Sequence, residues 1–119
     1  MMNQSKYFSE KEMACQHCGE VNWQQDFMEW LDEVREECGF PFVVTSGYRC
    51  PDHPIEAKKS SGPGSHSTGR AVDIAIAGPK AIKVIEVASR HGCKRVGVNA
   101  NIFIHLDDDP NRNPAIWTY

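Results

Sequence analysis

The sequence predicts a domain that mixes α-helices and β-strands, because segments of helical periodicity and short β-branched segments both occur along it. The 119 residues are 40% hydrophobic and 24% charged, an ordinary globular composition. This composition excludes a disordered or collagen-like chain. The length supports one hydrophobic core and leaves no room for a second folded unit, so we expect residues 1–119 to form a single domain.

The N-terminal part of the chain predicts two helices followed by a strand. Ser9 and Glu12 form a capping box, which places the start of a short helix at Ser9. From about Gln24, apolar residues recur at helical spacing, and Gly39 is placed to end that helix. The apolar positions are Phe27, Trp30, Leu31, Val34 and Cys38. The β-branched and aromatic residues 42–45 then predict a strand.

The remaining elements surround a long segment rich in turn formers. Glycine, proline and serine between Pro51 and Gly69 predict a long loop with one helical turn near residues 54–58, and such loops in small domains are usually functional. Residues 71–76 predict a strand. Pro79 and Gly92 mark the start and end of a helix. Residues 95–98 and 102–106 predict two further short strands.

Charge and hydropathy argue against two classes of function. A net charge of −3 and a pI near 5.9 do not suit a nucleic-acid-binding protein, which would need a basic face. Apolar runs are only a few residues long, so we expect no membrane insertion. Residues 1–6 lack the apolar core of a secretory signal, so we expect a protein that is cytoplasmic as synthesised. We also expect a monomer.

Five cysteines, an odd number, predict reduced thiols in the absence of a secretory signal. Cys15 and Cys18 have the spacing of half a zinc knuckle, with His17 between them. A structural zinc there would need two more ligands, and no second CxxC supplies them. We therefore expect a turn with two packed or occasionally oxidised thiols. An interaction domain built on a metal bound by Cys15 and Cys18 is the alternative.

Three residues form a candidate metal set: His66, Asp73 and His105. His66 and Asp73 are seven residues apart, and Gly69 allows a tight turn between them. His105 lies in an apolar strand, where an unpaired imidazole is costly. Two imidazoles and one carboxylate leave the fourth tetrahedral position of zinc open, as in catalytic sites. Calcium and magnesium prefer shells made of oxygen alone.

Four sequence motifs follow one another along the chain. They are T-S-G-Y-R-C-P at 45–51, His66-x₂-Gly69-x-Ala71-x-Asp73, V-G-V at 96–98 and F-I-H-L-D at 103–107. In this order they resemble the zinc DD-peptidase family, peptidase family M15. Its members are peptidoglycan peptidases of the D-Ala-D-Ala carboxypeptidase type, and they share their fold with the hedgehog signalling domain. The resemblance covers about residues 42–107. It implies an α+β fold with a small, mostly antiparallel sheet and helices packed on it.

The resemblance also implies roles for particular residues. It implies zinc held by His66, Asp73 and His105, with Arg49 near the substrate. A guanidinium suits that place because it offers a fixed fork to a terminal carboxylate or a developing oxyanion. A structural salt bridge beside the loop is the alternative for Arg49. Ser65 is expected either to hydrogen-bond the substrate or to cap the turn.

One position departs from the pattern of this family. Several members carry an acidic general base three residues before the last histidine ligand, where this chain has Ile102. Asp107 shares a strand face with His105, so it can polarise the zinc-bound water or orient an imidazole. Related sequences of the F-x-H-x-D form also have Asp at this place, which favours Asp107 over Asp108 or Asp109. We therefore predict Asp107 and Arg49 as catalytic residues.

The function that the resemblance implies is hydrolysis of peptide bonds in bacterial peptidoglycan stem peptides, by a carboxypeptidase or an endopeptidase. A zinc-activated water would be the nucleophile. The chain is similar to phage or prophage peptidases, so we expect it to act on the cell wall after release or as a phage component. The alternative is a catalytically inactive, zinc-bearing wall-binding or virion module, which the loss of the acid at Ile102 favours.

Overall fold

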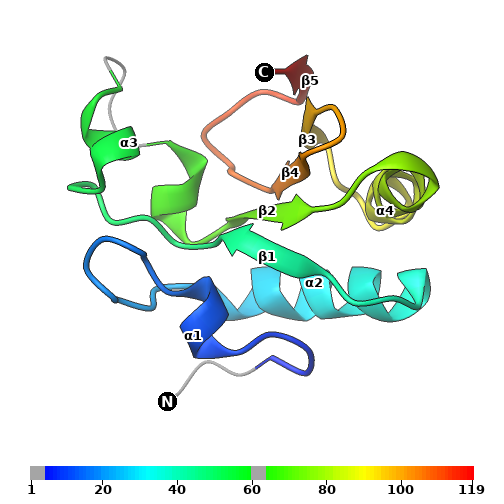
Figure 1. The fold of residues 1–119 in the computed structure, drawn as a ribbon, viewed down its shortest axis with the longest axis horizontal. Helices are drawn as coiled ribbons and strands as arrows, with labels where there is room; N and C mark the ends of the chain where they lie inside the picture. The colour runs from blue at the N-terminus through cyan, green and yellow to red at the C-terminus, as the bar shows by residue number, and fades with distance from the viewer. Residues whose placement is uncertain (1–4, 60–63) are drawn as a thin grey trace.

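A five-stranded mixed sheet forms the centre of the computed structural model, which describes residues 5–59 and 64–119. Its strands lie in the order β1-β2-β4-β3-β5 (Figure 1). Three neighbouring pairs are antiparallel, and only β5 runs parallel to its neighbour β3 among the described strands. The strands are β1 Val43–Ser46, β2 Ala71–Ala75, β3 Arg95–Asn99, β4 Phe103–Asp107 and β5 Ala115–Thr118. The predicted α+β fold with a mostly antiparallel sheet is confirmed.

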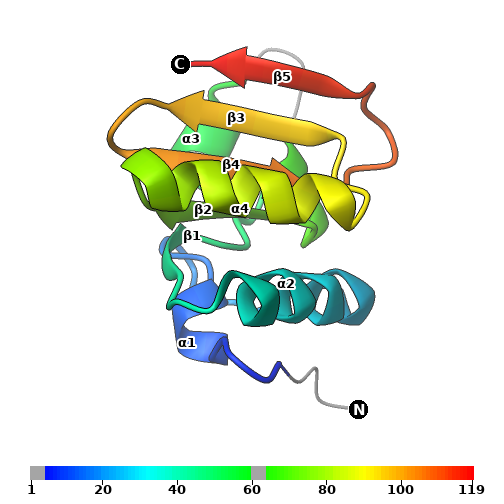
Figure 2. The same ribbon diagram turned by 90° about the vertical axis from the view of Figure 1, so that its right-hand side faces the viewer.

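Two long helices contact each other and cover one side of the sheet: α2 (Gln25–Cys38) and α4 (Gly78–Arg90). Figure 2 shows α4 in front of the strands and α3 (Pro54–Ala57) behind them. The helix α2 ends at Gly39, whose φ of 78° is left-handed and therefore favours glycine. The two remaining helices are short: α1 Glu10–Met13 and the 3₁₀ helix η1 Ser65–Thr68.

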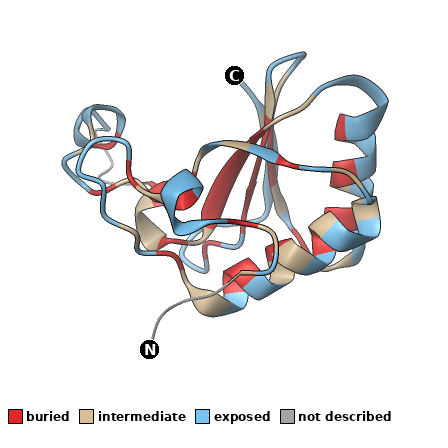
Figure 3. Cartoon of the chain, turned by 60° about the horizontal axis from the view of Figure 1, so that its bottom comes forward, coloured by how far each residue is buried: buried red, intermediate tan, exposed pale blue. Residues whose placement is uncertain are grey.

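The main hydrophobic core lies between the sheet and the helices α2 and α4 (Figure 3). Alternate residues of β2 and β4 point into it, and the intervening residues point to the opposite face of the sheet. Fully buried side chains of both layers meet there: Leu31, Val34, Val72, Ile74, Val84, Val87 and Leu106. Burial of this apolar surface fixes which face of β2 and β4 is left for other side chains.

Most of the predicted elements are confirmed. The Ser9–Glu12 capping box is present, α2 and α4 match their predicted ranges, and His53 and His91 occupy the ends of α3 and α4. The turn formers at residues 60–63 and the N-terminal residues 1–4 lie outside the described residues. Within the part of the chain that is described, every helix is too short or too polar to cross a membrane.

Neither β5 nor η1 is predicted from the amino-acid sequence. Three of the four residues of β5 are exposed, so it shows no clear alternation of buried and exposed positions. Its only strand partner in the described chain is β3, about twenty residues earlier along the chain. A strand that is held at the edge of a sheet mainly by backbone hydrogen bonds has few buried apolar side chains, so its sequence lacks the periodic pattern from which strands are predicted.

Candidate metal centre and its pocket

One row of directly opposed residues across the sheet positions the candidate metal ligands. Asp73 of β2 is paired with His105 of β4, His105 with Gly97 of β3, and Gly97 with Trp117 of β5. Directly opposed residues project to the same face of a sheet. The side chains of Asp73 and His105 therefore both project from the face opposite the one that packs on α2 and α4.

The third residue of the set, His66, comes from η1, which packs against β2. This short helix ends at Gly69, whose φ is 75°. A Cβ at Gly69 would lie 2.1 Å from the carbonyl oxygen of Asn22, so a larger residue would have to displace backbone. Gly69 thus makes the tight turn that the spacing between His66 and Asp73 predicts.

The donor atoms of these three residues converge on one point. Oδ1 of Asp73 lies 3.3 Å from Nε2 of His66 and 2.9 Å from Nδ1 of His105. All three side chains are buried. The structure thus brings together the three residues that the sequence proposes as metal ligands, with their donor atoms within 4.8 Å of one another.

Outer hydrogen bonds decide which nitrogen of each imidazole faces this point. Nδ1 of His66 lies 2.7 Å from the carbonyl oxygen of Gly47, and Nε2 of His105 lies 2.6 Å from Oδ2 of Asp107. A carbonyl and a carboxylate accept hydrogen bonds, so these outer nitrogens carry the protons. In the neutral imidazoles, the inner nitrogens then turn lone pairs toward the carboxylate of Asp73.

Three lone-pair-bearing atoms that face one another in a buried place repel unless a cation lies between them. Burial lowers the pKa of His105, but hydrogen bonds to Asp107 and Asp73 outweigh this effect and raise the pKa. Conversely, burial raises the pKa of Asp73, but hydrogen bonds to both imidazoles lower it overall. The donor set of two nitrogens and one oxygen, oriented from outside, fits a catalytic zinc.

Arg49 lies beside this cluster and forms a structural salt bridge, which the sequence leaves open as its alternative role. Its Nη1 forms a salt bridge with Oε2 of Glu56 at 3.1 Å, its Nη2 lies 3.6 Å from Oδ2 of Asp73, and its Nε donates to Ser46. The guanidinium is therefore fixed by structural contacts and also borders the metal cluster. Its action on substrate stays a prediction.

Glu56 is a residue of the site that sequence reasoning missed. Its side chain is buried, and it accepts hydrogen bonds from Arg49, Lys59 and the backbone N–H of Gly64. Burial raises the pKa of Glu56, but these donors outweigh it and lower the pKa, so the carboxylate stays charged beside Arg49. A glutamate in a turn-rich loop gives no sequence signal, because its burial depends on how the loop folds back.

Asp107 has no exposed surface, and both of its oxygens are engaged. Oδ2 accepts from His105, while Oδ1 accepts from Nε of Arg95 at 2.7 Å and from the backbone N–H of Asp109 at 3.1 Å. Of the two roles predicted for Asp107, this geometry favours orientation of the imidazole over contact with a reacting water. The neighbouring Asp108 pairs instead with Arg70.

Ser65 lines the pocket, but its hydroxyl already has a partner. It donates to Oδ2 of Asp109 at 2.9 Å, and both side chains are buried. The residue before η1 is Gly64, and no side chain caps that helix. The capping role for Ser65 is therefore not what the structure shows, and its contact with substrate stays a prediction.

A pocket of about 630 Å³ opens over the cluster. One wall is aromatic and comes from Phe103 of β4 and from the C-terminal residues Trp117 and Tyr119. The ring centroid of Trp117 lies 5.3 Å from that of His105. A Cβ on Gly97 would lie 2.6 Å from Nε1 of Trp117, so the absence of a side chain at Gly97 lets the indole lie across β3.

Basic side chains form much of the remaining lining of this pocket. Arg49, Lys59, Arg95 and Arg112 all border it, whereas Asp73 is the one carboxylate among the described lining residues. Each of these four cations is held by a carboxylate: Glu56 for Arg49 and Lys59, Asp107 for Arg95, and Asp109 for Arg112. Basic side chains therefore outnumber carboxylates in the lining itself, although the carboxylates behind them balance their charge.

The chain matches a known protein family over most of its length. The model of the family described as Peptidase M15 matches residues 6–107. This match includes His66, Asp73 and His105 and ends before β5, so Trp117 and Tyr119 lie beyond it. No curated protein is similar enough to the chain to count as a match.

We predict that His66→Ala and His105→Ala each release one equivalent of zinc relative to the unchanged protein, because each removes one of only three protein donors. Metal analysis after dialysis against a zinc buffer measures this. His91→Ala, at the end of α4, is the matched control and should keep the full metal content. Full retention in both His66→Ala and His105→Ala would overturn the ligand assignment.

We predict that Asp107→Asn weakens zinc binding by about 10- to 100-fold, because a neutral amide holds the N–H of His105 less strongly than a carboxylate does. Competition with a chromogenic chelator measures the affinity. Asp108→Asn is the control and should leave it unchanged. If Asp107 were instead the general base, the affinity would stay constant and kcat would fall by about 10²-fold.

Proposed function

The chain belongs to the peptidase M15 family, and from this membership and the site geometry we propose that it is a zinc-dependent peptidase of bacterial peptidoglycan stem peptides. The observation that carries the proposal is the convergence of three buried donor atoms at the pocket, each imidazole turned by an outer acceptor. His66, Asp73 and His105 would hold the metal. Bound zinc supplies Lewis acidity and lowers the pKa of a coordinated water towards neutrality.

The protein groups around the metal ligands orient the substrate in this proposal. Arg49, held by Glu56 and Ser46, offers its fork to a substrate carboxylate or to the oxygen of the scissile carbonyl. Because the guanidinium is already fixed by these contacts, little side-chain entropy is lost when substrate binds. Asp107 acts as a positioning residue that holds the imidazole of His105.

The pocket lining supports a peptide substrate that carries carboxylates. Peptidoglycan stem peptides are short, contain small residues and bear several carboxylate groups. The four basic side chains around the pocket match those charges, and the aromatic wall of Trp117 and Tyr119 offers a flat apolar surface for the peptide backbone and methyl groups.

A catalytically inactive wall-binding module is the second candidate. Ile102, at the position where several members of the family carry an acid, is exposed in the turn between β3 and β4. Asp107 is fully occupied by His105, Arg95 and Asp109. This alternative requires that zinc and stem peptides bind without cleavage.

We predict that the zinc-loaded protein cleaves one bond in defined stem peptides, that a chelator abolishes cleavage and that added zinc restores it. Mass spectrometry of the products identifies the bond and distinguishes a carboxypeptidase from an endopeptidase. His105→Ala, prepared in parallel, controls for contaminating peptidases. Binding of the peptides without any cleavage would support the inactive module instead.

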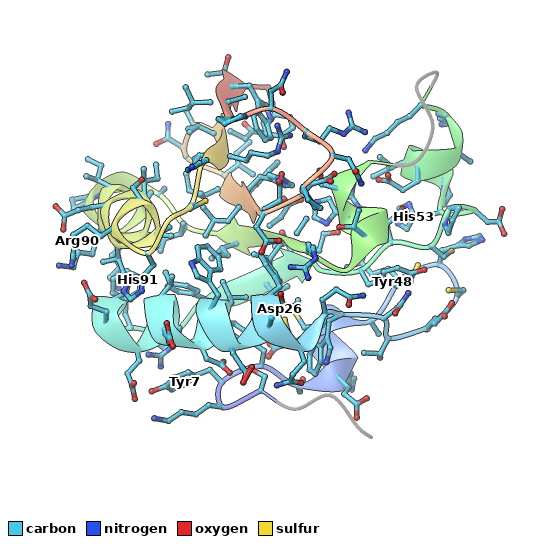
Figure 4. All side chains as sticks on the ribbon, turned by 180° about the vertical axis from the view of Figure 1, so that it is seen from behind. Tyr7, Asp26, Tyr48, His53, Arg90 and His91 are labelled. Carbon is cyan, nitrogen blue, oxygen red and sulfur yellow. The ribbon has the colours of Figure 1, made fainter. Side chains whose placement is uncertain are left out.

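We predict that Arg49→Lys lowers kcat/KM by about 10²-fold or more with the zinc content unchanged, because an ammonium keeps the charge but loses the fixed fork. Steady-state kinetics on the cleaved stem peptide and metal analysis of the same sample test this. Arg90→Lys is the control, since Arg90 lies at the far end of α4 (Figure 4). Unchanged kinetics in Arg49→Lys would make Arg49 purely structural.

A further inference from the structure

A second cluster of metal-binding side chains lies outside the site described above. The Sγ atoms of Cys15, Cys18 and Cys50 all lie within 4.8 Å of one another. The three cysteines are free thiols, and Cys15 and Cys50 are buried. From the CxxC pair alone, the sequence predicts a turn with packed thiols and leaves metal binding open for lack of further ligands. The fold supplies one of those ligands from a loop about thirty residues later.

The two chain segments that carry these cysteines each form a turn closed by a backbone hydrogen bond. The N–H of Gly19 donates to the carbonyl of Cys15 at 2.8 Å, which bends the chain so that Cys18 returns beside Cys15. The N–H of His53 donates to the carbonyl of Cys50 at 3.0 Å and makes a similar turn. The second segment therefore has the spacing Cys50-x₂-His53, which complements Cys15-x₂-Cys18 as the other half of a four-ligand site.

Two hydrogen bonds hold the two segments together, and one of them is accepted by a sulfur atom. The backbone N–H of Cys50 donates to Sγ of Cys15 at 3.3 Å, and the N–H of Tyr48 donates to the carbonyl of Met13 at 2.9 Å. Cys15, Tyr48 and Cys50 form a small buried cluster separate from the main core. So small a cluster contributes little hydrophobic stabilisation to these two segments.

We propose that Cys15, Cys18 and Cys50, with His53 as the fourth ligand, bind a structural zinc ion. A tetrahedral zinc with Zn–S bonds of about 2.3 Å needs sulfur atoms roughly 3.8 Å apart, so sulfurs already within 4.8 Å need only small movements. Binding transfers the thiol protons to solvent, and no redox partner is involved. Three thiolates and an imidazole form a closed shell that suits zinc or another soft divalent ion.

His53 is the imidazole that the spacing assigns to this site. It lies close to the loop that joins α1 and α2 (Figure 4). Its Nδ1 accepts from the N–H of Ile55 at 3.1 Å, and a metal bound through Nδ1 would replace this contact. His17 faces it with the ring centroids 6.2 Å apart, which makes His17 the comparison residue.

The place of this cluster gives it a structural role at the peptidase site. Cys50 follows Arg49 directly, and the carbonyl of Gly47, three residues earlier, orients His66. Gln16, between Cys15 and Cys18, lines the pocket and donates to the carbonyl of Thr45. A metal held by the two turns would tie the N-terminal loop to the chain that carries Arg49.

Cobalt titration of the reduced protein under anaerobic conditions tests the proposal. We expect two equivalents of Co²⁺ and a near-ultraviolet thiolate-to-cobalt charge-transfer band, which the nitrogen and oxygen ligands of the His66 site cannot produce. His105→Ala should lose one equivalent and keep the band. The second site is therefore tested independently of the peptidase proposal.

Substitutions locate the ligands. Cys18 is exposed, so Cys18→Ser leaves the buried packing intact. This variant should lose the charge-transfer band and one metal equivalent. Added to His105→Ala, it should also abolish the rise in melting temperature that zinc produces in His105→Ala. Cys38→Ser is the matched control and should behave like the unchanged protein. His53→Ala should shift the cobalt spectrum and weaken binding, whereas His17→Ala should not. The proposal would be overturned if the unchanged protein bound a single metal equivalent without the band, or if the freshly purified protein contained a disulfide within the cluster. An effect of His17→Ala, with none of His53→Ala, would show that His53 is not the fourth ligand.

Discussion

The alternation of side chains along β2 and β4 is the constraint on which the rest of the site depends. Val72 and Ile74 on one strand and Ile104 and Leu106 on the other must face α2 and α4, because that is where their apolar surface is removed from water. Asp73 and His105 are therefore forced to the opposite face, directly across from each other. A shift of one residue in this register would exchange the core and the metal ligands.

Charged groups on the ligand face are tolerated because each is compensated by a neighbour. Asp107 is fully buried, yet it accepts hydrogen bonds from His105, Arg95 and the backbone of Asp109. Glu56 is similarly satisfied by Arg49, Lys59 and the backbone of Gly64. A buried carboxylate that lost such a partner would be strongly destabilising. These networks therefore fix the side chains around the pocket as well as neutralising their charge.

Rigidity at the site comes from several segments that meet there. The strands β2 and β4 supply two of the candidate ligands, and η1 supplies the third. The segment that follows β1 supplies Arg49 and the outer acceptor for His66. The strand β5 adds the indole of Trp117 over Gly97. Gln16, in the loop between α1 and α2, also lines the pocket. A change in any of these segments can therefore alter the geometry at the metal ligands.

Elements and features that have a local cause could be predicted from the amino-acid sequence. Helical periodicity located α2 and α4, the capping box located α1, and β-branched runs located four strands. Ordered motifs with fixed spacing gave the family and the set His66, Asp73 and His105. Other contacts became visible only in the fold: Glu56 with Arg49, Ser65 with Asp109, Trp117 with His105, and Cys50 with Cys15 and Cys18. These contacts depend on loop closure and on pairing at the sheet edge, and neither leaves a periodic pattern in the chain.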